Sequence, residues 1–359
     1  MLVEVGAAFA IPVRLVGFLP ALTQFGLACG ITFILPLGDV ISARVLLITV
    51  IPLQIAALLL VFASGMASVL AVACFSIGVF GITPYILPPY ATVHAPAERV
   101  GHVTGVLTRG IIVGILLART AAGVIGTHLG WRAVYSIAAV CMGGVLVVVL
   151  RLIQPSPAAN SEPVRYGDLL LSLLRLVRTV PALRTAAICQ AFSFGSFNVF
   201  WLGSSLYLQS PRFGWTPESV GLVALVGAAA ASAAPLFGRA ADRIGPRITR
   251  IAALACMAVA WLLFVVFRQD LVGMTVGLVL LDIGATVTDI SNRTILYALD
   301  ARIRIRLNAT YTVAMFGGGA VLSALVGICW SLDGWMALCV LGLCPIVGAL
   351  VLAVRSEPT

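Results

Sequence analysis

The chain has 359 residues, of which 61% are hydrophobic and only 10% are charged, and its formal net charge is +9. Soluble domains carry about 25% charged residues, so the composition excludes a protein whose whole surface faces water. Apolar stretches near 20 residues recur, each long enough to cross about 30 Å of hydrocarbon as a helix, whereas the alternating segments of a membrane β-barrel are absent. We therefore expect an all-α integral membrane protein.

In chain order, the apolar stretches predict eleven membrane-spanning helices. They lie near residues 16–37, 45–64, 68–91, 103–127, 133–152, 185–208, 218–237, 250–268, 271–297, 307–330 and 335–354. The longest polar interval, 153–184, separates five helices from six. This predicts an N-terminal bundle over 1–152, a cytoplasmic linker over 153–184 and a C-terminal bundle over 185–359.

The linker changes character along its length. It begins rich in proline, serine and alanine, and from Tyr166 to Val180 it interleaves leucines with Arg175 and Arg178. This pattern is typical of an amphipathic helix that lies at the membrane surface.

All 22 basic residues are arginines, and their distribution predicts the topology. If the loops 35–44 and 238–247 share one side, that side holds fifteen arginines and the opposite side holds four. Because cytoplasmic loops carry an excess of basic residues, we place these loops and the C-terminus in the cytoplasm and residue 1 outside. The same bias accounts for the net charge, so we expect no nucleic-acid partner.

Two kinds of marker recur at nearly one offset. The loops LPLGDVISAR (35–44) and GRAADRIGPR (238–247), called the signature loops below, each carry an aspartate followed five residues later by an arginine. Asp39 and Arg44 therefore return 203 residues later as Asp242 and Arg247, and the Gly–Trp pair at 130–131 returns 204 residues later. The shared offset predicts parallel repeats, as in transporters built from two bundles.

The repeat also predicts a missing helix. The second half has 57 residues before Asp242, from 185 to 241, whereas the first half has 38 residues before Asp39. The difference of 19 residues corresponds to about one membrane span. We therefore expect a six-plus-six arrangement that lacks its first helix.

The chain resembles the major facilitator superfamily of secondary transporters over essentially its whole length. GRAADRIGPR is similar to the superfamily's loop between the second and third helices of each half, with Gly238, Asp242, Arg243, Gly245 and Arg247 at the matching positions. The runs LTQFGLACGITFILPLGD, GILLARTAAG and RLNATYTVAMFGGGA resemble a bacterial subgroup of drug, sugar and nucleoside exporters.

The first signature loop departs from that pattern, because Leu35 replaces the glycine and Val40 replaces the first arginine. The resemblance implies that each loop aspartate approaches the N-terminal end of a helix from the opposite half, where the helix dipole favours a negative charge. Asp39 would approach the helix that starts near residue 306, and Asp242 the one that starts near residue 102. The alternative is a solvated loop whose charges only follow the topology.

Charged residues inside the predicted spans indicate a transport pathway, since each costs about 2.5–3.5 kcal/mol on insertion scales. Asp282 lies near the middle of the span 271–297, where a desolvated carboxyl group could take up and release a proton. Its alternative role is a structural hydrogen bond to a neighbouring helix. Asp289 and Arg293, four residues apart on one helix face, predict an internal pair or part of a cytoplasmic gate, and Asn292 adjoins them.

Other polar groups in the spans are candidates for the same pathway. Arg119 could attract an anionic group of the substrate, and Gln190, Asn198 and Gln24 could line the cavity. Hydrogen bonds between helices would account for the amides equally well. We find no nucleotide-binding loop and no metal-ligand or catalytic spacing, so we expect no enzyme activity, no cofactor and no metal.

These observations together predict a monomeric secondary transporter of the bacterial inner membrane. We expect proton-coupled efflux of small organic molecules by alternating access. Two alternatives stay open: an importer of the same fold, and a truncated membrane protein that does not transport.

Overall fold

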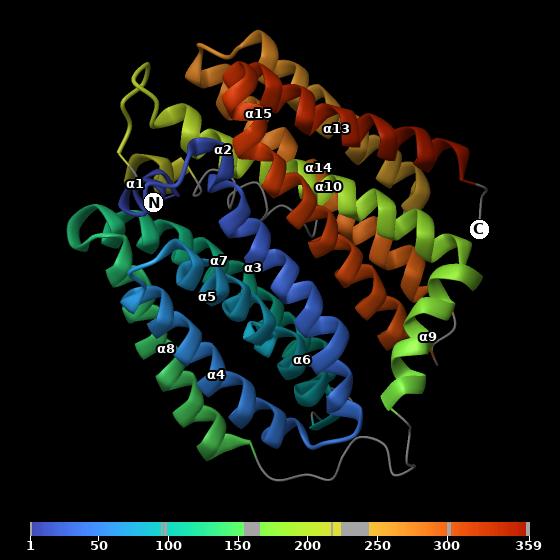
Figure 1. Cartoon of the computed structure of the whole chain (residues 1–359). Helices are drawn as coiled ribbons and strands as arrows, with labels where there is room; N and C mark the ends of the chain where they lie inside the picture. Colours follow the sequence, from blue (N-terminus) through green and yellow to red (C-terminus); the bar gives the residue numbers. More distant parts are fainter. Residues whose placement is uncertain are drawn as a thin grey trace. The chain divides into compact units, whose positions relative to one another are not determined.

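The computed structural model describes residues 2–94, 96, 99–153, 166–216, 218–223, 244–299 and 303–356, apart from some side chains within these ranges. These residues form helices and connecting turns, and no strand occurs among them (Figure 1). The chain divides into two compact units: unit 1 comprises Leu22–Leu171, and unit 2 comprises Leu2–Ala21 together with Ser172–Thr359.

Unit 1 is a set of helices joined by short turns. Its elements are the end of α3 (Phe18–Cys29), η1 (Gly30–Ile34), η2 (Leu35–Asp39), α4 (Ala43–Ala63), α5 (Ala67–Phe80), α6 (Thr83–His94), α7 (Val100–Leu129), α8 (Trp131–Leu152) and the start of α9 (Tyr166–Thr179). The hydroxyl of Ser42 accepts a hydrogen bond from the Val45 amide (3.3 Å) and so caps the start of α4. α4 lies along α8.

Glycines allow α3 and η1 to approach α5 closely. A Cβ atom on Gly26 would overlap the carbonyl oxygen of Phe75, and one on Gly78 would overlap that of Thr23. Gly30 of η1 lies in the same way against the carbonyl oxygen of Val79. Small residues at such positions let helix backbones touch, which is a principal source of helix association in membranes.

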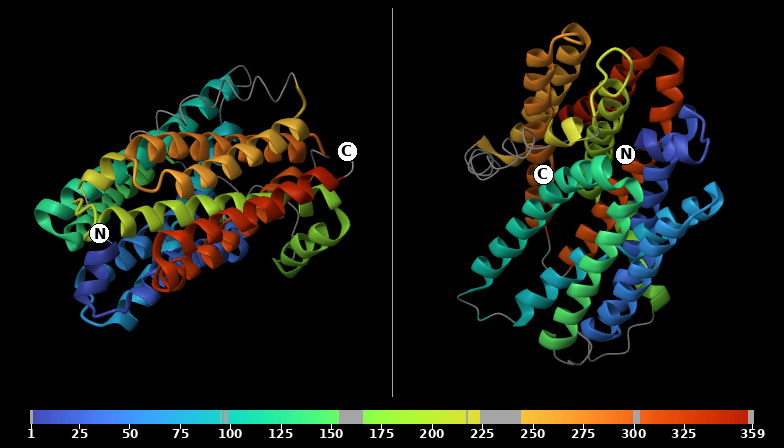
Figure 2. Two further views of the ribbon diagram at one scale, coloured as in Figure 1. Left: turned by 90° about the horizontal axis from the view of Figure 1, so that it is seen from above. Right: turned by 90° about the vertical axis from the view of Figure 1, so that its left-hand side faces the viewer.

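Unit 2 contains the other described helices. Its elements are α1 (Leu2–Ala8), α2 (Val13–Val16), the end of α9, α10 (Pro181–Leu208), α13 (Pro246–Val266), α14 (Leu271–Tyr297) and α15 (Arg304–Arg355). α15 has non-helical backbone angles at Asp333 and Gly334, so it consists of two helices that meet there. α10 packs along α15, and α13 along α14, as Figure 2 shows from two sides.

An aromatic cluster fills the interior of unit 2. The ring of Phe200 stacks on that of Phe264 with centroids 4.6 Å apart, and Tyr207 stacks on Trp335 at 4.5 Å. The indole of Trp335 donates a hydrogen bond to the carbonyl oxygen of Phe264 (3.0 Å) at the end of α13. Offset and stacked aromatic pairs add to the stability that their buried area already supplies.

Seven helical segments within the described ranges are long and apolar enough to cross a membrane. They are Val13–Gly38, Ala43–Ala63, Ala67–Pro88, Trp131–Leu152, Pro246–Val266, Leu271–Tyr297 and Arg306–Arg355. The last of these contains two predicted spans, and α7 and α10 lie at two others. The predicted span 218–237 falls mostly outside the described residues, so the total of eleven stays a prediction. The class of all-α membrane protein is confirmed.

The predicted repeat has a counterpart in the backbone. Gly130 and Gly334 both have positive φ angles, +82° and +54°, which a glycine adopts without strain. Each is followed by a buried tryptophan that starts the last helix of its half, Trp131 or Trp335. The predicted bundle boundaries stay a prediction, and residues 2–21 group with unit 2, where α2 packs against α15.

Candidate functional site

The cytoplasmic ends of α14 and α15, as the topology predicts them, are joined by a charged network. The carboxylate of Asp289 accepts hydrogen bonds from Arg293 Nε (2.9 Å) and from the hydroxyl of Tyr311 (2.7 Å). Asn308 Oδ1 in turn accepts hydrogen bonds from Arg293 Nη1 and from the hydroxyl of Tyr297 (3.3 Å). The arrangement fits the expected pair between Asp289 and Arg293 and extends it to the neighbouring helix.

This network holds the carboxylate in one position. Each oxygen of Asp289 has a donor of its own, and the guanidinium of Arg293 also lies over the ring of Tyr311, 5.1 Å from its centroid. Hydrogen bonds to a charged group are roughly twice as strong as neutral ones. Separating α14 from the start of α15 would therefore require several strong contacts to break together.

A second polar cluster lies in the interior of unit 2. Arg250 is 3% exposed, and its Nη1 donates to Asn292 Oδ1 (3.4 Å). Asn292 Nδ2 donates to Gln190 Oε1 (3.4 Å), and Gln190 Nε2 contacts the sulfur of Met315 (3.5 Å). Arg250 Nη2 donates to the hydroxyl of Ser356 (3.2 Å). These contacts connect α10, α13, α14 and α15.

Arg250 is not among the site residues predicted from the sequence, where it counts only as one of the fifteen arginines on the predicted cytoplasmic side. The repeat held a signal that could have found it. The offset of 203 residues between Arg44 and Arg247 places Leu47 opposite Arg250, and Leu47 is fully buried. An arginine at the repeat position of a buried leucine predicts a buried charge.

Asp282 occupies the middle of α14, and its side chain is 5% exposed. It lies seven residues, or about two helical turns, from Asp289. The same helix therefore carries one buried acid in its middle and one acid fixed by an arginine near its end.

Three predicted pathway residues remain, Asn198, Gln24 and Arg119. Asn198 Nδ2 donates to the carbonyl oxygen of Phe194 one turn earlier in α10 (2.8 Å). Gln24 and Arg119 lie in unit 1, on α3 and α7. Their roles stay predictions.

The signature loops are described in part. Gly238, Asp242 and Arg243 lie outside the described residues, and so does the side chain of Asp39. The predicted approach of each loop aspartate to a helix of the opposite half, called the latch below, therefore stays a prediction. Gly245 has φ of +96° directly before α13, a conformation that favours glycine.

The two signature arginines make matching contacts in the two units. Arg44 Nη2 donates to the carbonyl oxygen of Leu150 (3.3 Å), and Arg247 Nη2 donates to that of Val354 (2.9 Å). Leu150 and Val354 are 204 residues apart and lie in the last turns of α8 and α15. A cation at this end of a helix satisfies free carbonyl groups and complements the dipole.

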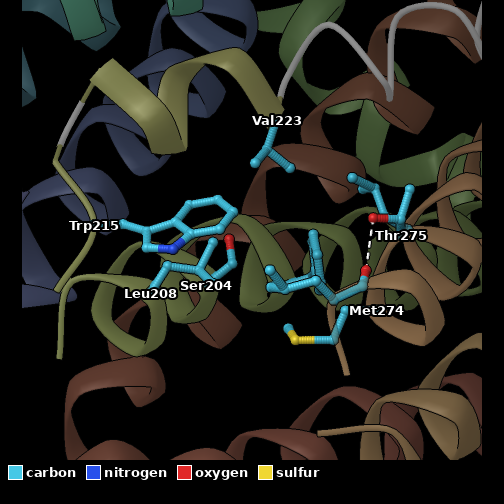
Figure 3. A pocket seen from close by; sticks show the side chains of 9 residues that line it. Ser204, Leu208, Trp215, Val223, Met274 and Thr275 are labelled. Atoms are coloured by element: carbon cyan, nitrogen blue, oxygen red, sulfur yellow. Dashed lines mark hydrogen bonds between the residues drawn. The ribbon is translucent and has the colours of Figure 1, made fainter. Parts of the chain in front are cut away.

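A small apolar pocket of about 50 Å³ lies in unit 2 between the end of α10 and the start of α14 (Figure 3). Its lining includes Ser204, Leu208, Trp215, Val223, Met274 and Thr275. The hydroxyl of Thr275 donates to the carbonyl oxygen of Leu271 in its own helix (2.8 Å). Pockets for drug-sized ligands measure about 300–1,000 Å³, so this pocket can hold only a small group. Among the described residues, no three His, Cys, Asp or Glu side chains gather as metal ligands.

Comparison with known proteins identifies the family. The sequence profile described as Major Facilitator Superfamily matches residues 1–212, which is more than half of the chain. The chain belongs to the major facilitator superfamily.

Relatives agree with this assignment over most of the chain. "Uncharacterized transporter YgaY" of Escherichia coli O157:H7 is 29% identical over 93% of this chain and 84% of its own length. "Probable transporter SCO4007" of Streptomyces coelicolor is 30% identical over 95% of this chain and 79% of its own length. "Multidrug resistance protein MdtG" of Escherichia fergusonii is 30% identical over 44% of this chain and 39% of its own length.

Major facilitator superfamily proteins are transporters that bind small molecules within a membrane. The chain is accordingly a multi-pass membrane transporter and not an enzyme. The resemblance read from the signature loops is thus confirmed at the level of the family.

Proposed function

We propose that this major facilitator superfamily transporter exports small organic molecules in exchange for protons. Cargo and protons would use the same pathway in turn, by alternating access. The proposal rests first on Asp282, a carboxyl group buried in the middle of a membrane-length helix. An ionisable group at that depth is costly, and its default interpretation is functional.

Asp282 would carry the proton. In a dry environment its neutral form is favoured, and contact with water favours the charged form. A conformational change that alternately dries and wets this part of α14 would therefore load and unload one proton. Asn in place of Asp cannot do this, because an amide has no proton to release near neutral pH.

Asp289, Arg293 and Tyr311 would act as a gate element. Their contacts join α14 to the start of α15, and they lie on the side that the arginine distribution assigns to the cytoplasm. Asn292 and Gln190, connected to Arg250, would stabilise the adjacent helices. Arg119, Asn198 and Gln24 would line the pathway from their own units.

Export of drug-like molecules is supported by the relative named as a multidrug resistance protein, which covers 44% of this chain. The bacterial sources of the relatives support the bacterial inner membrane as the location. We further propose that the protein acts as a monomer and that its C-terminus lies in the cytoplasm. Asp39 and Asp242 would each form the latch by approaching a helix of the opposite half.

The test uses the purified chain in proteoliposomes with an acidic lumen. A panel of labelled lipophilic cations, uncharged antibiotics, nucleosides and sugars is added outside. An exporter that exchanges cargo for protons accumulates at least one compound in the lumen as protons leave, and an ionophore that removes the pH gradient abolishes the accumulation. Asp282→Asn should lose accumulation but retain exchange of compound down its own gradient.

The matched control is Asp270→Asn, the same change at the start of the same helix. Asp270 accepts hydrogen bonds from the amides of Val272 and Gly273 as an N-cap, and Asn caps helices equally well. This variant should accumulate compound as the wild type does. Accumulation by Asp282→Asn at the wild-type rate would remove Asp282 from the mechanism. Uptake only with an alkaline lumen would favour an importer, and no uptake of any compound would favour a protein that does not transport.

A further inference from the structure

Helix α9, Tyr166–Thr179, has two different faces. Leu171, Leu174, Arg175 and Arg178 are spaced i, i+3, i+4 and i+7, which places them in one stripe along the helix. Leu171 and Leu174 are 58% and 63% exposed, and both arginines are exposed. Leu176, by contrast, is 8% exposed and points away from this stripe.

The inner face of α9 packs against the helices of the charged network. Leu176 belongs to a buried cluster with Leu296 of α14 and with Leu307 and Tyr311 of α15. The hydroxyl of Tyr311 is the donor to Asp289 (2.7 Å). The inner face of α9 and the Asp289 network therefore border one shared buried cluster, to which Leu176 and Tyr311 both belong.

The outer stripe combines exposed leucines with two cations. Neither Arg175 nor Arg178 forms an ion pair within the described part of the chain. A helix of this kind lies in the plane of the membrane interface, with its apolar side chains at the acyl boundary and its cations at the lipid phosphates. Each cation near an anionic leaflet contributes about 1 kcal/mol, or roughly a five-fold effect on binding.

We propose that the outer stripe of α9 docks on anionic lipid headgroups and that Leu176 transmits this docking to Tyr311 and Asp289. Anionic lipid holds α9 against the ends of α14 and α15. The packing of Leu176 then favours the position of Tyr311 in which its hydroxyl reaches Asp289. The charge of the inner leaflet would in this way stabilise the closed arrangement of the network. Only the consequence for transport rests on the proposed function.

Hydrogen exchange measured by mass spectrometry tests docking and transmission without any transport assay. The full chain is reconstituted into phosphatidylcholine vesicles with increasing fractions of phosphatidylglycerol, and protection is followed in peptides from α9 and from the start of α15. In the wild type, protection should rise with phosphatidylglycerol in both regions. Arg175→Gln with Arg178→Gln should weaken the docking of α9 on phosphatidylglycerol, seen as its gain in protection, by roughly twenty-five-fold, about five-fold for each arginine, and Arg175→Lys with Arg178→Lys should restore it.

Two further variants separate lipid docking from general charge and from packing. Arg212→Gln with Arg268→Gln removes two exposed arginines from the opposite end of the spans, and protection of α9 should respond to phosphatidylglycerol as in the wild type. Leu176→Ala should preserve the response of α9 but abolish that of the α15 peptide.

Docking is refuted if protection of wild-type α9 does not change with the phosphatidylglycerol fraction. It is also refuted if protection in the variant with Arg175→Gln and Arg178→Gln rises as it does in the wild type. Transmission is refuted if the α15 peptide responds equally in Leu176→Ala. Failure of every variant to transport would contradict the proposed function and leave these exchange results unaffected.

Discussion

Arg250 places a positive charge in the interior of unit 2 with neutral partners among the described residues. Its hydrogen bonds to Asn292 and Ser356 are long, 3.4 and 3.2 Å. Taking a charge out of water is expensive, and replacing buried charged groups by apolar residues of similar volume is often neutral or stabilising. A stabilising contribution from Arg250 itself is therefore not expected, and its neighbours mainly limit the cost of burying it.

The cost of burying Arg250 determines whether two substitutions raise or lower the free energy of unfolding. Arg250→Met should leave the free energy of unfolding unchanged or raise it by up to about 2 kcal/mol, since it removes the buried charge and retains volume. Asn292→Leu should lower it by about 1–3 kcal/mol, because Arg250 and Gln190 both lose a partner. The double variant should be less destabilised than Asn292→Leu, because only Gln190 then lacks a partner, a non-additive result. Thermal unfolding in detergent measures all three, and a loss in Arg250→Met larger than in Asn292→Leu would contradict the account.

At the scale of helices, the contact of α3 and η1 with α5 depends on glycines. Gly26 and Gly78 each face a backbone carbonyl of the other helix, and backbone cannot move aside as a flexible side chain can. Added atoms in a tightly packed contact force the helices apart at a cost of about 1–3 kcal/mol.

Gly78→Ala should therefore destabilise the protein by about 1–3 kcal/mol. Gly143→Ala is the matched control, because Gly143 lies within α8 and no atom lies within 4 Å of where its Cβ would be. That change should stabilise the protein by about 0.5–1 kcal/mol, as alanine is the better helix former. Equal shifts in unfolding temperature for Gly78→Ala and Gly143→Ala would contradict the close backbone contact between α3 and α5.

Many helix positions could be predicted from the sequence, because the signals for them are local in the chain. Apolar length predicted the membrane helices, and the separate spans predicted at 307–330 and 335–354 leave a break where α15 has non-helical backbone angles, at Asp333 and Gly334. The change to π-helix in η1 was not predictable, because GITFI reads as ordinary apolar helix.

The candidate site was predictable only where its partners share a helix. Asp289 and Arg293 are four residues apart, so the sequence alone paired them. Tyr311, Asn308 and Arg250 reach Asp289, Arg293 and Asn292 from other helices. Such contacts depend on how each helix is rotated about its axis, and apolar periodicity is weak in helices that are hydrophobic on all sides.

At the scale of the whole chain, composition and repeat lead to the same conclusion as family membership. A chain with 10% charged residues, seven membrane-length helical segments among its described residues and a superfamily match is a membrane transporter. Arg44 and Arg247 make matching hydrogen bonds, which supports the predicted repeat at the level of individual contacts. Beyond family membership, we propose that movement of the cargo is coupled to movement of protons in the opposite direction.

The most direct measurement of coupling reverses the driving force. Proteoliposomes are loaded with an accumulated compound, placed in compound-free buffer at equal pH, and followed with a luminal pH indicator. Because coupling between two ligands is reciprocal, efflux of the compound should draw protons inward and acidify the lumen, and Asp282→Asn should release compound without this acidification. A luminal pH that stays constant or rises while the wild type releases compound would contradict proton exchange.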